Sequence, residues 1–177
     1  MAISKSQARD FTTYARNPET WLLCARRHLA VAELLFKRVA ELRMQQDHSI
    51  DEFSGCHYAG YLHAGLAVEN AAKAGLISND PSIVLPGGLD REKLGKRMGH
   101  GLLGLVESVL EGLSEIERRL LTKLEEHVVW AGKYTVPMKA DVLYDDAALN
   151  TMRSSPLNEW KILQSLIARL HAKAMYK

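Results

Sequence analysis

Apolar residues recur three or four positions apart in the first quarter of the chain. The members of this series are Trp21, Leu22, Ala25, Leu29, Ala32, Phe36, Val39 and Leu42. Such spacing places the apolar side chains on one face of an α-helix. The preceding Asn17-Pro18-Glu19 is typical of a helix start, because it combines a capping side chain, a proline at the first helical position and an acid near the positive end of the helix dipole. The pattern predicts an amphipathic helix of about 27 residues, roughly 40 Å long.

A second helix is predicted after the polar stretch 45–50. Ser49 and Glu52 have the spacing of a capping box, and we expect the helix to run to about Ile77. Its middle, GYLHAGLAVENAAKAGL, is rich in glycine and alanine. Residues this small let neighbouring backbones approach closely. Because each glycine costs about 1 kcal/mol relative to alanine within a helix, tertiary packing must compensate.

The polar and apolar pattern predicts two more helices before residue 135. Residues 78–99 contain two prolines and a glycine pair and are expected to form a loop. A short helix follows over about His100–Leu113. A capping box at Ser114 and Glu117 opens a longer helix that reaches about Tyr134.

These predictions together describe an all-α protein, since no alternating run of useful length suggests a strand. The last helix starts at Ser155-Pro156, after a long connection over residues 135–155, and residues 1–16 are expected to be an irregular lead-in. Helices of this length joined by short and medium loops pack most simply as an up-and-down bundle. We therefore expect a single domain over residues 1–177, with four main helices plus one short helix.

Composition narrows the class of protein further. The 177 residues are 47% hydrophobic and 25% charged, with a formal net charge of +2, so a nucleic-acid role would depend on a local patch. The two cysteines, Cys24 and Cys56, give neither zinc spacing nor a disulfide framework, and we expect no metal and no cofactor. The absence of an 18-residue apolar run and of an apolar signal core leads us to expect a cytoplasmic protein without a membrane span.

The second helix carries the first candidate site. At 100° per residue, Glu69 and Lys73 fall on the same stripe as Leu62 and Leu66, with Tyr58 close by. One interpretation is an ordinary i,i+4 pair at the edge of a surface, which stabilises a helix by a few tenths of a kcal/mol. The other is a partly buried pair that has a structural role or lines a site and that needs further partners.

His100 is the second candidate, because it lies at the predicted first turn of a helix. Unpaired backbone N–H groups and the helix dipole favour anions there, and Lys96 and Arg97 add positive charge. The alternative is a polar cap residue beside a solvated loop. Lys133 and Tyr134 end the predicted fourth helix, where a cation is favoured by the dipole.

A small basic element closes the chain. Arg169, Lys173 and Lys177 are expected to form a solvated tail, with contact to an acidic partner as the alternative.

Three segments in this order resemble the HEPN domain family (higher eukaryotes and prokaryotes, nucleotide-binding). They are YLHAGLAVENAAKAGLI, GHGLLGL and WAGKYTVP, and the resemblance spans roughly residues 21–137. It matches Glu69 and Lys73 to the family's acid and lysine, His100 to its histidine, and Lys133-Tyr134 to its basic-aromatic pair. The resemblance implies a helical bundle in which these residues converge, often near a homodimer interface.

Many members of that family are ribonucleases with an R-x(4–6)-H motif. The match in this chain, Arg43-MQQD-His48, lies at the end of the first predicted helix, whereas the family's motif belongs near the later helices. The sequence also lacks H-E-x-x-H, G-x-S-x-G and a Walker-type loop. These observations lean against a metal-independent ribonuclease of the usual kind.

We therefore expect a non-catalytic HEPN-like module that recognises a nucleotide, RNA or a protein partner through Glu69, Lys73, Lys96, Arg97, His100, Lys133 and Tyr134. The resemblance implies a homodimer and a partner of the nucleotidyltransferase, toxin–antitoxin or defence kind. One alternative is an RNA-cleaving or nucleotide-modifying enzyme with His100 as general acid or base and the nearby cations stabilising phosphate charge. A second alternative is a purely structural, dimerising helical protein.

Overall fold

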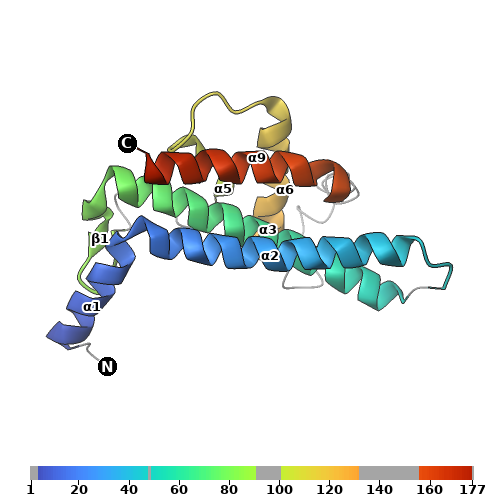
Figure 1. Cartoon of the computed structure of the whole chain (residues 1–177), viewed down its shortest axis with the longest axis horizontal. Coiled ribbons are helices and arrows are strands. Elements are labelled where there is room, and N and C mark those ends of the chain that lie inside the picture. Colours follow the sequence, from blue (N-terminus) through green and yellow to red (C-terminus); the bar gives the residue numbers. More distant parts are fainter. Residues whose placement is uncertain (1–3, 48, 91–100, 132–155, 177) are drawn as a thin grey trace.

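The protein is an all-α helical bundle (Figure 1). A computed structural model describes residues 4–47, 49–90, 101–131 and 156–176. Its helices are α1 (Lys5–Arg16), α2 (Pro18–Arg43), α3 (Ile50–Asn79), α5 (Leu102–Glu107), α6 (Glu115–Glu126) and α9 (Pro156–Met175). A 3₁₀ turn (Pro81–Ile83) and a hairpin of β1 (Val84–Leu85) and β2 (Gly88–Leu89) follow α3, and α6 continues as a π-helical segment, His127–Ala131.

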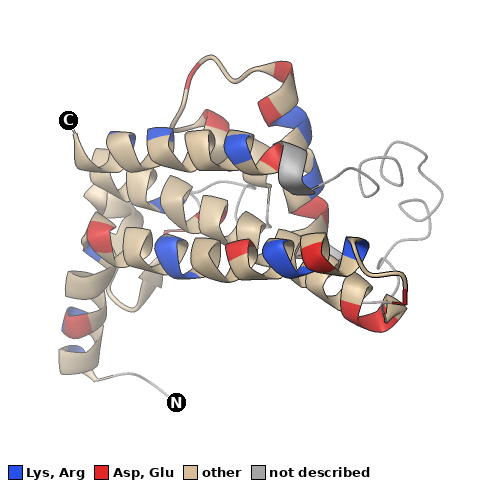
Figure 2. Cartoon of the chain, turned by 45° about the vertical axis from the view of Figure 1, so that its right-hand side comes forward, with Lys and Arg blue, Asp and Glu red and all other residues tan. Residues whose placement is uncertain are grey.

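Helices α2 and α3 lie side by side along most of their length, and α9 runs alongside them (Figure 1). Helix α6 crosses behind this layer at a steep angle (Figures 1 and 2), and the short α5 packs between α3 and α6. The large core cluster draws on all five of these helices, with members that include Phe36, Tyr61, Val68, Leu102, Leu124 and Leu166. The predicted fold class, an all-α bundle, is confirmed.

Close helix packing explains Gly60 and Gly65 of α3. A Cβ on Gly60 would lie 2.5 Å from the ring of Phe36 on α2, and one on Gly65 would lie 2.4 Å from Val128 after α6. The predicted role of these small residues is therefore confirmed. The energetic cost of a helical glycine is offset by the burial of the larger partners.

The helix starts follow the capping residues predicted from the sequence. The side chain of Asn17 accepts from the amide of Glu19 at the start of α2, and Ser114 forms a full capping box with Glu117 at the start of α6. Ser49 caps α3 by accepting from the amide of Glu52. These side chains satisfy backbone donors that a helix leaves open at its first turn.

The expectation of an irregular lead-in over residues 1–16 is wrong, because Lys5–Arg16 is a helix. Ser4 and Gln7 form a capping box at its start, and this cap is the feature of the sequence that indicates a helix here. This helix projects from one end of the bundle (Figure 1) and buries only Ala15, against Ile77 and Val84. An apolar periodicity search misses a helix with so little buried surface.

Two other boundaries differ from the prediction. The loop expected over 78–99 contains a hairpin, whose turn requires the positive φ of Gly87 (88°). The short helix expected over His100–Leu113 is helical only at Leu102–Glu107, after which Val109, Leu110 and Leu113 pack into the core without a regular helix. No described helix combines the length and the apolarity needed to cross a membrane.

Candidate functional site

Glu69 and Lys73 form an ion pair on the edge of α3. The Lys73 Nζ donates to Glu69 Oε1 at 2.5 Å, and only 19% and 13% of the lysine and glutamate side chains are exposed. The equivalent i,i+4 pair on α2, Glu33 and Lys37, is 44% and 65% exposed. The expectation of a partly buried pair is therefore confirmed, and its role in binding stays a prediction.

Lys73 also lies over an aromatic ring. Its Nζ is 5.7 Å from the centroid of the Trp21 indole, within the range of a cation–π interaction. The indole is fixed in turn, because Trp21 Nε1 donates to the carbonyl oxygen of Ala15 at 2.8 Å. The pair thus lies where α1, α2 and α3 meet, and its ammonium has a defined position.

An apolar pocket of about 280 Å³ opens beside this junction. Its lining includes Phe11 and Tyr14 of α1, Trp21 and Cys24 of α2, and Asn70 of α3. Phe11 and Tyr14 are 38% and 70% exposed. Aromatic surface and a positioned ammonium therefore lie on the same end of the bundle.

Five predicted site residues lie outside the described part of the chain: Lys96, Arg97, His100, Lys133 and Tyr134. His48, the histidine of the arginine–histidine match at 43–48, also lies outside the described residues. The described chain resumes at Gly101, and the next residue, Leu102, is fully buried beneath Gly65. Gly65 is one helical turn from Glu69 on α3. Leu102 of α5 thus packs against α3 one turn before Glu69 and about two turns before Lys73.

A buried polar cluster that the sequence analysis missed joins three helices. Lys123 of α6 is 1% exposed and donates to the hydroxyl of Tyr61 on α3 (2.6 Å) and to Oε2 of Glu159 on α9 (2.9 Å). The Tyr61 hydroxyl donates to the same carboxylate oxygen at 2.5 Å. Burial lowers the pKa of Lys123, and the hydrogen bond and charge of Glu159 oppose that shift.

His127 lies next to this cluster, at the start of the π-helical segment. Its Nδ1 donates to the carbonyl oxygen of Lys123 at 2.9 Å, and its ring centroid is 4.8 Å from that of Tyr61. The Nε2 atom is buried and has no hydrogen-bond partner within the described residues. Burial lowers the pKa of His127 to about 4, with a further contribution from the charge of Lys123, so the imidazole is neutral at pH 7.

The sequence positions of Lys123 and His127 could have identified them as buried polar residues. Lys123 lies about 60° and His127 about 20° from Leu120 on the helical wheel, so both fall beside the apolar stripe of α6, as Glu69 and Lys73 do beside that of α3. A charged residue on an apolar stripe predicts a buried partner. Lys123 and Tyr61 are almost fully buried and the Glu159 side chain is only 20% exposed, so we assign the cluster a structural role.

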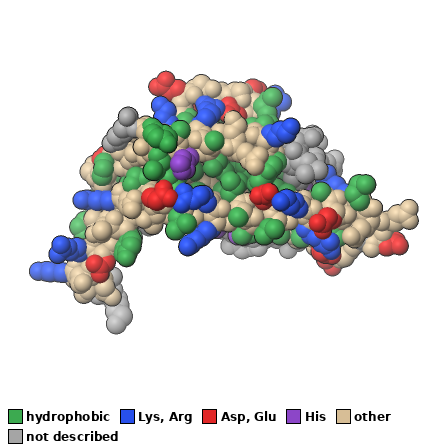
Figure 3. All heavy atoms as spheres, viewed as in Figure 1, with side chains coloured by type: hydrophobic (Ala, Val, Ile, Leu, Met, Phe, Trp, Pro, Cys, Tyr) green, Lys and Arg blue, Asp and Glu red, His purple; other side chains and the backbone are tan. Residues whose placement is uncertain are grey.

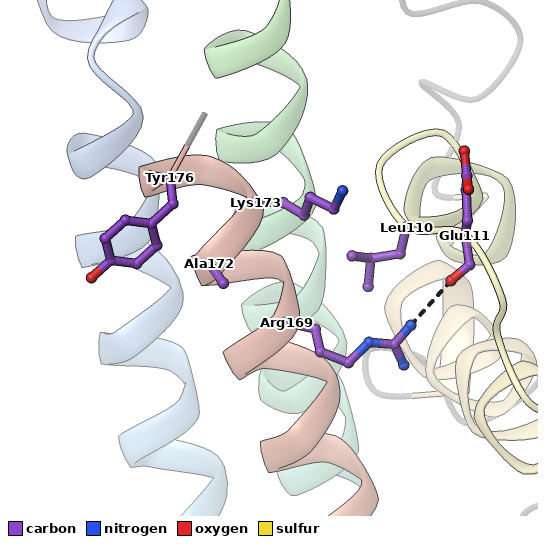
Figure 4. Close-up of a pocket in the computed structure, with 6 residues that line it drawn as sticks. All are labelled: Leu110, Glu111, Arg169, Ala172, Lys173 and Tyr176. Atoms are coloured by element: carbon purple, nitrogen blue, oxygen red, sulfur yellow. Dashed lines mark hydrogen bonds between the residues drawn. The ribbon is translucent and has the colours of Figure 1, made fainter.

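The basic element of α9 is more ordered than a solvated tail. Arg169 donates to Oε1 of Glu117 (2.6 Å) and to the carbonyl oxygen of Glu111 (3.2 Å), so the expectation of a tail is wrong for this residue. Figure 4 shows Arg169 reaching across to Glu111, with Lys173 one turn further along the helix. The two cations, Leu110 and Glu111 line an open pocket of about 430 Å³.

The residues that contact Glu117 lower the pKa of its carboxyl group. Burial would raise its pKa, but hydrogen bonds from Ser114 and the charge of Arg169 outweigh burial and lower it. The carboxylate that caps α6 is therefore also the anchor of α9. Tyr176 lines the same pocket, but its ring points away from the two cations (Figure 4).

Among the described residues, no group of three His, Cys, Asp or Glu side chains has the geometry of a metal site. Comparison with known proteins gives no match to a family model, to a curated protein or to a solved structure. The resemblance to HEPN domains thus depends on the sequence motifs alone.

Proposed function

We propose that this protein is a non-catalytic, HEPN-like binding module that recognises a nucleotide, RNA or a protein partner. The observation that carries the proposal is the Glu69–Lys73 pair, whose ammonium is held at 2.5 Å from a carboxylate and 5.7 Å from the Trp21 indole. Lys96, Arg97, His100, Lys133 and Tyr134 are the further ligand-binding residues that the family resemblance supplies.

The geometry of the pair suits binding. Glu69 holds the Lys73 ammonium at 2.5 Å, which orients the lysine as a hydrogen-bond donor for a ligand. The ammonium has three hydrogens, and Glu69 accepts one of them. The other hydrogens can donate to a phosphate or carboxylate oxygen, and the adjacent indole can contact an apolar or aromatic part of the same ligand.

The resemblance also supplies a proposal for assembly. We propose a homodimer, with a nucleotidyltransferase-type or defence-system protein as the partner class. Such an assembly would cover part of the surface around α3.

Fluorescence anisotropy with a labelled single-stranded RNA, and calorimetry with nucleoside triphosphates, test the proposal. Lys73→Ala should weaken binding about tenfold, which corresponds to roughly 1.4 kcal/mol. Lys37→Ala is the matched control, because it breaks an i,i+4 pair with Glu33 that is largely exposed. It should change affinity less than twofold. Circular dichroism confirms that each variant is folded.

Two results would overturn the proposal. One is equal binding by the wild type, Lys73→Ala and Lys37→Ala for the ligand that binds best. The other is cleavage of RNA by the purified protein that His100→Ala abolishes, since this would establish the enzymatic alternative.

A further inference from the structure

Helix α1 and the β1–β2 hairpin enclose a cleft of about 490 Å³ that is lined by cations. Lys5, Arg9 and Arg16 contribute the charge, Thr12 and Thr13 lie between them, and Pro86 of the hairpin turn forms the opposite wall. Among the described residues that line the cleft, none is acidic. Lys and Arg side chains are prominent at this end of the molecule, at the lower left of Figure 3.

The three cations form one stripe along α1. They follow the spacing i, i+4 and i+11, which places them within about 40° of one another around the helix. Their positions along the axis are separated by about 6 Å and about 10 Å, so the stripe is roughly 16 Å long. A single phosphate cannot reach across this length, whereas a chain of phosphates can.

These charges are available to a ligand. Among the described residues, none of the three forms an ion pair with a carboxylate. Arg16 is anchored by donation from Nη2 to the carbonyl oxygen of Val84 at 3.2 Å, which leaves the remaining guanidinium N–H groups for other acceptors. The cations of α2 differ, because acidic residues alternate with them along the helix (Figure 2).

The two threonines add a second type of contact. Thr12 and Thr13 donate their hydroxyl hydrogens to the carbonyl oxygens of Ala8 (2.8 Å) and Arg9 (3.0 Å). Their oxygens are then left as acceptors, which a phosphate cannot use but a ribose 2′-hydroxyl can. The cleft thus combines donors for phosphates with acceptors for sugar hydroxyls.

We propose that this cleft binds the sugar–phosphate backbone of single-stranded RNA. Phosphate contacts through Lys5, Arg9 and Arg16 supply the affinity, and the threonine oxygens distinguish ribose from deoxyribose. An anionic membrane is a poorer fit, because the exposed apolar residues Phe11 and Tyr14 lie on the other side of the helix from the cations. The inference goes beyond the proposed function, since the cleft shares no residue with the Glu69–Lys73 site.

The test measures binding of a labelled 12-nucleotide oligouridylate by fluorescence anisotropy at several salt concentrations. Three phosphate contacts predict a slope of log K against log salt near −2, because each contact on a single strand contributes about −0.7. The triple variant Lys5→Gln/Arg9→Gln/Arg16→Gln should bind at least tenfold more weakly and lose most of that slope. The double variant Lys5→Gln/Arg9→Gln leaves the hydrogen bond of Arg16 intact and should lose about two thirds of the slope of log K against log salt.

The matched control is Arg27→Gln/Lys37→Gln/Lys161→Gln, which removes the same net charge from exposed positions on α2 and α9. It should bind RNA within twofold of the wild type. Thr12→Val/Thr13→Val should lower the preference for RNA over the matching DNA by at least threefold. Circular dichroism and melting curves verify that each variant retains its helices.

Several results would overturn the inference: equal losses in the triple variant and the charge-matched control, inorganic phosphate displacing the RNA at low millimolar concentration, or binding to phosphatidylserine vesicles without binding to RNA. Lys73→Ala separates the two proposals. If it changes nothing while the α1 triple variant fails to bind, the cleft stands and the Glu69–Lys73 site falls; the reverse pattern overturns the cleft.

Discussion

The ammonium of Lys123 lies 2.9 Å from the carboxylate of Glu159 in the middle of the bundle. The lysine is 1% exposed, and the glutamate side chain 20%, so the pair connects a fully buried residue of α6 to a residue of α9 that has some access to solvent. Removing one partner from such a pair costs more than a surface ion pair would contribute, because the other charge is left in a poorly solvated place.

Glu159→Gln should therefore lower the free energy of unfolding by about 3 kcal/mol, since buried Lys123 loses the counter-ion that offsets the desolvation of its charge. Urea denaturation at pH 7 measures the change. Glu115→Gln is the control, because it breaks an exposed pair with Arg119 (69% and 76% exposed) and should cost less than about 1 kcal/mol. Equal costs for the two variants would contradict a buried pair.

The stability of the fold should fall as the pH falls from 7 to 4. His127 has a pKa of about 4 in the folded protein and 6.5 when exposed, so between these values the unfolded chain binds more protons. The loss should reach about 3 kcal/mol at pH 4 from this residue. Urea titrations at pH 7, 6, 5 and 4 measure it.

His127→Gln should flatten this dependence, because the variant has no group to titrate at that position. Burial, and then the charge of His28, also lower the pKa of His63, which contributes in the same direction. His63→Gln separates the two contributions and should have the smaller effect, since this side chain is only partly buried. An unchanged slope in His127→Gln would show that the imidazole is solvated.

Two glycines of α3 should respond in opposite ways to alanine. Gly65→Ala places a methyl group 2.4 Å from Val128 and 3.1 Å from the carbonyl oxygen of Leu124, and should destabilise the fold by about 1 to 3 kcal/mol. A methyl group at Gly55 meets nothing within 4 Å, so Gly55→Ala should stabilise it by about 0.5 to 1 kcal/mol. Thermal melts of both variants measure the signs, and a stabilising Gly65→Ala would refute the close approach of α3 to the end of α6.

The two serine caps should differ in their effect on global stability. Ser114→Ala removes the cap of α6, a helix of the core, and should cost about 1 kcal/mol in urea denaturation. Ser4→Ala removes the same kind of cap from α1, which buries only Ala15. It should lower the helical circular dichroism signal while leaving the urea midpoint nearly unchanged. Equal shifts in the midpoint would mean that α1 unfolds together with the bundle.

The apolar periodicity and capping residues were sufficient to predict α2, α3, α6 and α9, because each of these helices buries a continuous stripe or a cap that leaves a local signature. Helix α1 also carries a cap, Ser4 with Gln7, but it buries only Ala15, and a cap without a buried stripe did not lead to its prediction. The same periodicity placed Glu69 and Lys73 correctly on a buried edge, since an i,i+4 contact is local.

The cluster of Tyr61, Lys123 and Glu159 could not be predicted in the same way. Lys123 and Tyr61 are 62 positions apart, and Lys123 and Glu159 are 36 apart. Their contact depends on how α6 crosses α3 and α9, and periodicity within one helix carries no information on crossing angles. The sequence indicated that Lys123 lies on an apolar face, but not which residue neutralises it.

Asn17 alone connects α1 to α2: it caps the end of the first helix and the start of the second. Its backbone N–H donates to the carbonyl oxygen of Tyr14 at the end of α1 (3.2 Å), and its side chain accepts from Glu19 at the start of α2 (3.0 Å). No loop therefore separates the two helices, and Asn17 fixes their relative orientation. A residue inserted into α1 between Arg9 and Asn17 would rotate every earlier position by about 100° and carry Lys5 and Arg9 away from the hairpin. The distance in sequence from these cations to Asn17 is thus as much a part of the cleft as their charge.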